Sequence, residues 1–229
     1  MNSTYTRAWI KCLTVSLLSA LYFSPICFSN DAQAELLDKD VTEPYYKSYR
    51  YEQVGDYNNA INSLLMIKKS TPTNYTANLR LGYLYFMNKN YANAVVHYQI
   101  AHKTAPQAIS PQLGLMRIMN TQNNYTQTEA AGYKILQLDL YNYYGNLYLA
   151  HALRMNKKFN SAISINLKML ALYPSDTQFL LEYGLLTFAQ GKDEQAKQAL
   201  EYLLVLEPEN IVAKETLQIL NRHVMETQK

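Results

Sequence analysis

The prolines of this chain follow a 34-residue frame. Four of them are separated by 34, 68 and 34 residues: Pro72, Pro106, Pro174 and Pro208. The frame skips position 140, which holds leucine. Alanines keep the same spacing at Ala60, Ala94, Ala162 and Ala196, with Thr128 in the vacant place. A fixed period of this length predicts an array of similar units rather than one globular core.

Each unit contains two apolar stretches with helical spacing, separated by a polar turn. In the second unit these stretches contain Leu81 and Tyr85, then Ala94 and Tyr98, and residues 88–90 lie between them. This pattern predicts two antiparallel helices joined by a short turn. The frame prolines lack the N–H group that a helix interior needs, so they are expected to end each second helix.

Three segments carry a resemblance to a known family: GDYNNAI (55–61), NYANAVVHYQIAHKTAP (90–106) and LEYGLLTFAQGKDEQAKQALEYLLVLEPEN (181–210). They closely resemble the tetratricopeptide repeat, which implies an all-α solenoid of five helix-turn-helix units. The predicted units are residues 41–74, 75–108, 109–142, 143–176 and 177–210. A flexible lead is expected at 35–40, and a capping helix with a tail at 211–229. Small residues at Gly82, Ala150 and Gly184 are expected to let helices pack closely.

The end of such an array needs a cap, because each hairpin buries its apolar face only against a neighbour. The segment after residue 210 is predicted to supply it. The apolar positions expected to cover the fifth unit are Ile211, Val212, Leu217, Ile219 and Leu220.

The third unit departs from the pattern. It lacks the proline, has Thr128 for alanine and carries Gly114 and Gly132 at helical positions. Glycine costs a helix about 1 kcal/mol relative to alanine. We therefore expect this unit to be the least protected part of the array.

Residues 1–34 are predicted to be an export signal. Arg7 and Lys11 precede an apolar run at 12–28 that Pro25 interrupts, and Ala32-Gln33-Ala34 is typical of a cleavage site. The mature chain would begin at Glu35 and reach the periplasm of a Gram-negative bacterium. The alternative is an uncleaved membrane anchor, for which this run is short.

Charge and cysteine content exclude several function classes. Both cysteines, Cys12 and Cys27, precede the expected cleavage site, so the mature chain has no disulfide or thiol chemistry. Removing Arg7, Lys11 and Asp31 changes 21 basic and 18 acidic residues to 19 and 17, a net charge of +2. That balance does not favour nucleic acid as a partner.

No constellation typical of catalysis or metal binding is present. The closest histidines, His97 and His102, are five residues apart and do not share a helix face. The sequence contains no nucleophile elbow and no glycine loop for phosphate. We therefore expect no enzyme activity, no cofactor and no metal, and we expect His97, His102 and His223 to be surface residues.

What remains is a binding surface. The resemblance implies that the first helix of each hairpin lines a concave groove. Carried over unit by unit, the groove residues are Tyr45, Tyr46, Tyr49, Arg80, Tyr83, Phe86, Met87, Arg117, Asn120, Tyr144, Tyr148, His151, Arg154, Glu182 and Phe188.

Three of these are arginines spaced 37 residues apart, at Arg80, Arg117 and Arg154. A diagonal of guanidinium groups among tyrosines would suit an extended chain that carries carboxylates. The alternative is that the aromatic rings pack between hairpins while the arginines are solvated or paired with Glu52 and Glu182. Both interpretations stay open at this point.

The leading functional hypothesis is a non-catalytic scaffold that binds a protein segment in the assembly of an envelope, secretion or pilus machine. The alternative is a glycan-handling component of an exopolysaccharide system, because tyrosines could stack on sugar rings. Relatives that grip the acidic C-terminus of a chaperone use Lys and Asn where this chain has Tyr45 and Tyr49, so that function is not expected.

Overall fold

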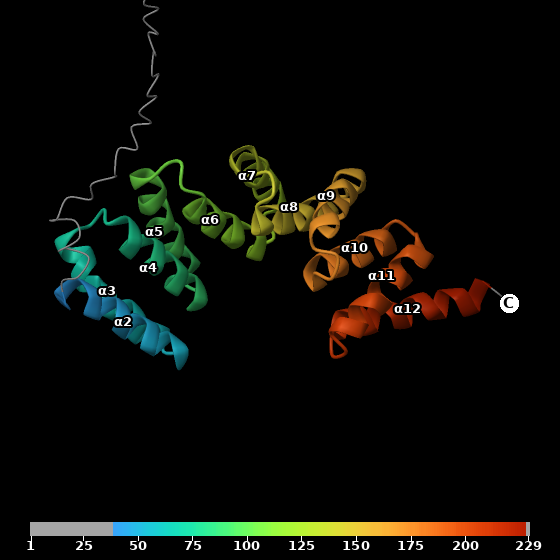
Figure 1. Cartoon of the computed structure of the whole chain (residues 1–229), viewed down its shortest axis with the longest axis horizontal. Coiled ribbons are helices and arrows are strands. Elements are labelled where there is room, and N and C mark those ends of the chain that lie inside the picture. Colours follow the sequence, from blue (N-terminus) through green and yellow to red (C-terminus); the bar gives the residue numbers. More distant parts are fainter. Residues whose placement is uncertain (1–38, 228–229) are drawn as a thin grey trace, which may run out of the picture.

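The computed structural model describes residues 39–227, and this part of the chain consists of helices and turns (Figure 1). The first helices of five successive hairpins are α2 (Lys39–Gln53), α4 (Tyr75–Met87), α6 (Ile109–Thr121), α8 (Tyr143–Met155) and α10 (Thr177–Ala189). The second helices are α3 (Tyr57–Ser70), α5 (Tyr91–Thr104), α7 (Tyr125–Leu138), α9 (Phe159–Leu172) and α11 (Asp193–Leu206). A last helix, α12 (Ile211–Thr227), follows the fifth hairpin. The predicted all-α solenoid of five hairpins and a C-terminal helix is confirmed.

A left-handed residue closes every first helix. These residues also recur every 34 positions: Gly55, Lys89, Asn123, Lys157 and Gly191, with φ between 58° and 76°. A residue in this conformation ends a helix by turning the chain away from its axis. In the first three hairpins an Asp or Asn follows and caps the second helix, as Asn90 does by accepting from the N–H of Asn93. The residues that form these turns therefore recur with the same 34-residue period as the prolines.

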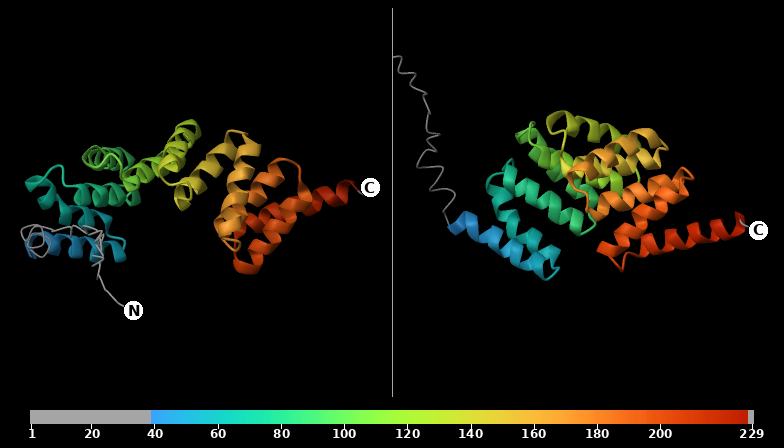
Figure 2. Two further views of the ribbon diagram at one scale, coloured as in Figure 1. Left: turned by 45° about the horizontal axis from the view of Figure 1, so that its top comes forward. Right: turned by 45° about the vertical axis from the view of Figure 1, so that its right-hand side comes forward.

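The hairpins stack into an arc, with α2 and α12 at its two ends (Figure 1). Turning the molecule shows the same succession of hairpins winding along the arc (Figure 2). Successive first helices contact one another, α4 with α6, α6 with α8 and α8 with α10. In the described chain no comparable contact joins two successive second helices. The first helices therefore converge on the inner face of the arc.

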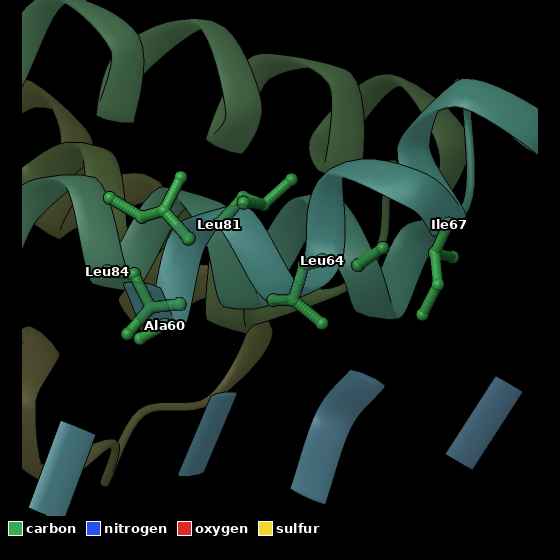
Figure 3. Packing of buried hydrophobic residues seen from close by; sticks show 7 residues of the cluster. Ala60, Leu64, Ile67, Leu81 and Leu84 are labelled. Atoms are coloured by element: carbon green, nitrogen blue, oxygen red, sulfur yellow. The ribbon is translucent and has the colours of Figure 1, made fainter. Parts of the chain in front are cut away.

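The core is a series of small clusters between neighbouring helices. At the first hairpin boundary, Leu64 and Ile67 of α3 pack with Leu81 and Leu84 of α4, and all four are at most 7% exposed (Figure 3). Burying a leucine side chain contributes roughly 1.5–3 kcal/mol. Each hairpin thus depends on its neighbour for stability.

The cap is formed by some of the expected residues, Leu217 and Leu220, together with Ala213. In α12, Ala213 and Leu220 are buried and Leu217 packs against the fifth hairpin. Ile211 and Val212 are 67% and 46% exposed, so the expectation that they cover this hairpin was wrong. Residues three, four and seven apart share a helix face, and that spacing carries the contact from Ala213 onward.

The predicted export signal, residues 1–34, lies outside the described residues. So do the first four residues of the predicted lead, whereas its last two, Lys39 and Asp40, belong to α2. Over the part of the chain that was searched, none of the helices combines the length and apolar character that a bilayer crossing requires.

Candidate functional site

The predicted groove residues all lie on first helices, and one of them, Phe188, packs against the core of the fifth hairpin. Three of them are more than half exposed, Tyr46 at 64%, Tyr144 at 55% and Tyr49 at 52%. Others pack between hairpins, as the alternative interpretation predicted. Tyr45 is half-buried, for example, and its hydroxyl lies 3.5 Å from Asn74 Oδ1.

Arg80, in the second hairpin, is held by the first. Its guanidinium forms an ion pair with Glu52 and stacks over the ring of Tyr49 at 3.7 Å, and its Nε donates to Ser48 at 3.3 Å. The side chain is 9% exposed. Its positive charge is therefore balanced within the protein.

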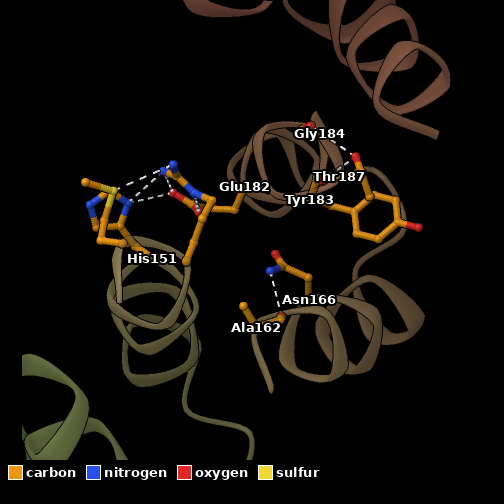
Figure 4. Close-up of polar contacts among 9 residues, drawn as sticks. His151, Ala162, Asn166, Glu182, Tyr183, Gly184 and Thr187 are labelled. Carbon is orange, nitrogen blue, oxygen red and sulfur yellow. Dashed lines mark hydrogen bonds and ion pairs between the residues drawn. The ribbon is translucent and has the colours of Figure 1, made fainter. Parts of the chain in front are cut away.

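Arg154 is balanced in the same way by Glu182 of the fifth hairpin, which lies beside His151 (Figure 4 labels these two). It donates from Nε to Glu182 Oε2 at 2.8 Å, and His151 Nδ1 lies 2.8 Å from Glu182 Oε1. Burial raises the pKa of Glu182, but hydrogen bonds from His151 and Arg154 outweigh it and hold that pKa below its usual value. For Arg80 and Arg154 the structure agrees with the alternative interpretation, in which the arginines are solvated or paired with Glu52 and Glu182.

Arg117, on the middle hairpin, differs from the other two arginines. Its guanidinium stacks over the ring of Phe86 at 4.3 Å. Within residues 39–227 it takes part in none of the ion pairs that hold Arg80 and Arg154. The predicted diagonal of three cations thus contains one whose charge is not matched.

A pocket of about 350 Å³ surrounds this arginine where the second, third and fourth hairpins meet. Its lining comes from α4, α5, α6 and α8 and contains no carboxylate. The lining residues are Leu79, Tyr83, Tyr98, Ser110, Leu113, Gly114, Arg117, Tyr144 and Tyr148. Four of them, Tyr83, Arg117, Tyr144 and Tyr148, belong to the predicted set.

Tyr98 was not predicted to take part, because it lies on a second helix. Its ring passes between two glycines of neighbouring first helices. A Cβ built on Gly82 would lie 2.7 Å from the ring, and one built on Gly114 would lie 2.3 Å from it. Only glycine leaves room here, and the tyrosine thereby reaches the pocket from behind.

A sequence signal for this arrangement exists. The 34-residue frame aligns Gly114 with Tyr46, Arg80, Tyr148 and Glu182. A glycine at a groove position in one unit predicts a gap in the groove, which a neighbouring side chain can fill. The family resemblance did not predict the role of Tyr98, because the groove positions carried over from the family lie on first helices only.

Two tyrosines of the pocket, Tyr98 and Tyr148, keep their protons over the physiological range. Burial raises the pKa of Tyr98 to about 12, against an opposing effect of the nearby Arg117. Burial also raises the pKa of Tyr148, again opposed by Arg117. Both phenol groups therefore lie close enough to the guanidinium to sense its charge, and both keep a proton that they can donate.

His97 is a buried residue, so its prediction as a surface histidine was wrong. It is 2% exposed, its Nδ1 lies 2.8 Å from Asn78 Oδ1, and its ring stacks on Tyr85. Burial, together with the charge of Lys68, lowers its pKa to about 4. The neutral ring fills space between α4 and α5. His102 is half-buried, and the side chain of His223 lies outside the described set.

The described residues contain no group of three or more His, Cys, Asp or Glu side chains arranged to hold a metal ion. The cluster of His151, Arg154 and Glu182 contains a single carboxylate, and two donors already occupy it. Its arrangement suits a structural contact between hairpins.

No family model matches the sequence, and no curated protein matches it either. Solved structures do match in fold. A tetratricopeptide repeat protein from Parabacteroides merdae ATCC 43184 aligns with a TM-score of 0.70 and 16% identity over 80% of this chain and 73% of that one. YrrB, described as a TPR protein with an unusual peptide-binding site, aligns with a TM-score of 0.63 and 12% identity over 83% and 98%.

A thermophilic TPR protein from Thermus thermophilus aligns with a TM-score of 0.62 and 12% identity, over 78% of this chain and 97% of that one. The three likenesses extend over most of each chain. This chain has the tetratricopeptide-repeat fold.

Proposed function

We propose that this protein is a non-catalytic adaptor that holds a segment of another protein in the groove formed by its first helices. The observation that carries the proposal is the composition of this inner face. Three tyrosines there are more than half exposed, and Arg117 forms no ion pair within the described part of the chain. Tyrosine and arginine are enriched at protein interfaces, because each supplies a large contact area together with a polar group.

The fold supports the same proposal. Stacked hairpins present an extended concave surface, which suits a partner segment in extended form. YrrB, which has the same fold, is described as having a peptide-binding site. We propose further that the protein acts in an exported compartment, the periplasm, and serves an envelope, secretion or pilus machine. Support for this comes from the sequence of residues 1–34.

Photo-crosslinking in the native host tests the groove. A benzophenone amino acid would replace Tyr46 or Tyr144 on first helices, and Tyr133 or Tyr202 on second helices as matched controls. The controls are 45% and 43% exposed, so they are also accessible. We expect a discrete protein adduct from the first pair and none from the second. Adducts confined to Tyr133 and Tyr202 would move the binding surface to the second helices.

A glycan-handling function is the second candidate. The rings of Tyr144 and Tyr148 stack at 6.1 Å with an angle of 26°, and such a pair can lie against a sugar ring. If no protein adduct forms at Tyr46 or Tyr144 and the protein is retained on immobilised exopolysaccharide, this candidate replaces the adaptor. Loss of retention in a Tyr144→Ala variant would then locate the sugar in the groove.

A further inference from the structure

The pocket around Arg117 is the part of the groove with the most specific chemistry. Gly114 and Tyr98 both line it: the other hairpins carry a side chain at the position of Gly114, and here the Tyr98 ring occupies the space beside the glycine. The volume of about 350 Å³ accommodates a side chain of a partner but is small for a folded element. The pocket is therefore suited to one residue of a bound segment.

Its charge is unbalanced. Arg80 and Arg154 are each satisfied by a carboxylate from a neighbouring hairpin. Arg117 stacks on the ring of Phe86 and, among residues 39–227, forms no ion pair of the kind that holds the other two; no carboxylate is among the residues that line the pocket. A guanidinium offers two parallel N–H groups that match the two oxygens of a carboxylate. The missing charge is thus that of an acidic ligand group.

The remaining walls narrow the choice of anion. Tyr98 and Tyr148 lie near the guanidinium as protonated phenols, which can donate to an oxygen atom. Leu79 and Leu113 supply apolar surface beside them. A phosphate would bring about two negative charges to a partly buried site with one cation, which costs desolvation energy that a single carboxylate avoids. The site favours a carboxylate on an apolar stem.

We infer that Arg117 and the neighbouring tyrosines bind the side-chain carboxylate of a glutamate or aspartate within an extended segment of the partner. This inference rests on the proposed function and names the residue that the groove selects. The carboxylate belongs to a side chain because the pocket lies at the middle hairpin. First helices of neighbouring hairpins lie on both sides of α6, α4 before it and α8 after it, so a bound chain can run past the pocket in both directions.

Small probes test the pocket apart from any partner. The dissociation constants of 3-phenylpropionate and of its uncharged amide would be measured on the full chain by NMR titration. We expect the acid to bind at least tenfold more tightly than the amide. Arg117→Gln should abolish this preference, and Lys134→Gln, which removes the same charge from an exposed site on α7, should retain it. Equal binding of the two probes, or a preference that survives Arg117→Gln, would overturn the inference.

Three pentapeptides identify the source of the carboxylate. Two are capped at both ends and carry either glutamate or glutamine between two phenylalanines; the third carries glutamine there and has a free C-terminus. Tightest binding of the glutamate peptide, lost in Arg117→Gln, is the expected result. Tight binding of only the free C-terminus would overturn the assignment to a side chain. If crosslinks form at Tyr46 and Tyr144 while the acid binds no better than the amide, this inference fails and the adaptor proposal stands. If no crosslinks form while the acid binds better through Arg117, the adaptor proposal fails and Arg117 remains a carboxylate site without a partner segment.

Discussion

Arg154 donates hydrogen bonds from Nε and Nη2 to the two carboxylate oxygens of Glu182, which belongs to the next hairpin. Glu182 is 9% exposed, so the carboxylate is removed from water and depends on these donors. A contact of this kind fixes the angle between the fourth and fifth hairpins. Arg154 would have to break this ion pair, at a cost in free energy, before it could bind a ligand.

Glu182→Gln is expected to destabilise the protein. The substitution keeps the shape but removes the charge that Arg154 and His151 share, and losing one partner of a buried pair costs about 2–4 kcal/mol. Urea denaturation followed by circular dichroism measures the change. Glu201→Gln is the control, because Glu201 is exposed and lies 3.9 Å from Lys197; its effect should stay within about 0.5 kcal/mol. Equal effects of the two variants would show that the buried pair is not stabilising.

His97 predicts how stability responds to acid. Its pKa is 6.5 as a free side chain and about 4 in the folded protein, because the ring is buried beside Lys68. Below pH 6.5 the unfolded chain takes up a proton that the folded chain accepts only near pH 4, so stability falls as the pH decreases between these values. The His97→Gln variant should lose less stability than the wild type between about pH 7 and pH 4.5, by about 1 kcal/mol or more. Identical losses would contradict the buried neutral state.

Gly114→Ala is expected to destabilise the protein although alanine is the better helix former. The new Cβ would lie 2.3 Å from the Tyr98 ring, and overpacking of this kind costs about 1–3 kcal/mol. The helix gains only about 1 kcal/mol in return. In a Tyr98→Leu background the clash is absent, so the same substitution should cost less or stabilise. If Gly114→Ala stabilised the wild type, the packing of Tyr98 against Gly114 would be refuted.

Lys192→Asn should stabilise the fifth hairpin. Lys192 occupies the N-cap of α11 without a side-chain bond, where Asp56, Asn90 and Asn124 cap the corresponding helices. A capping side chain contributes about 1 kcal/mol. The matched comparison is Ala108→Asn at the uncapped start of α6, where the gain in stability should be smaller. Asn74 and Asn142 each accept a hydrogen bond from the N–H three residues later, and in α6 that position is Pro111, which has no N–H. Thermal unfolding of both variants decides the order.

Amide exchange should be fastest in residues 109–142. The first helix of this hairpin lacks a side-chain cap, and both of its helices contain glycine. Gly132 packs closely against Leu149, so tertiary contacts oppose the effect without removing it. Hydrogen exchange measured by mass spectrometry compares this segment with 75–108 and 143–176. Slower or equal exchange in 109–142 would refute the prediction.

The hairpins were predictable from sequence, because their turns recur in one frame and each turn contains residues that end or begin helices. Arginine pairing was not decidable at that level. Arg80 pairs with a residue 28 positions earlier and Arg154 with one 28 positions later, and periodicity alone does not choose between these directions. Tyr98 and His97 were missed for a related reason. Both lie on α5, and their burial depends on residues of other helices: Tyr98 packs against Gly82 and Gly114, and His97 contacts Asn78 and Tyr85.

On the inference that Arg117 binds a carboxylate, the glycine at position 114 bears on the selectivity of the inner surface. An array of equivalent hairpins would present the same relief at every step, and a bound segment could then slide from one step to the next. The pocket at the middle step would remove that freedom, because one alignment places an acidic side chain over Arg117. The register of the bound segment would thus be fixed at the glycine, and the partner would have to place an acidic residue at the matching position of its sequence.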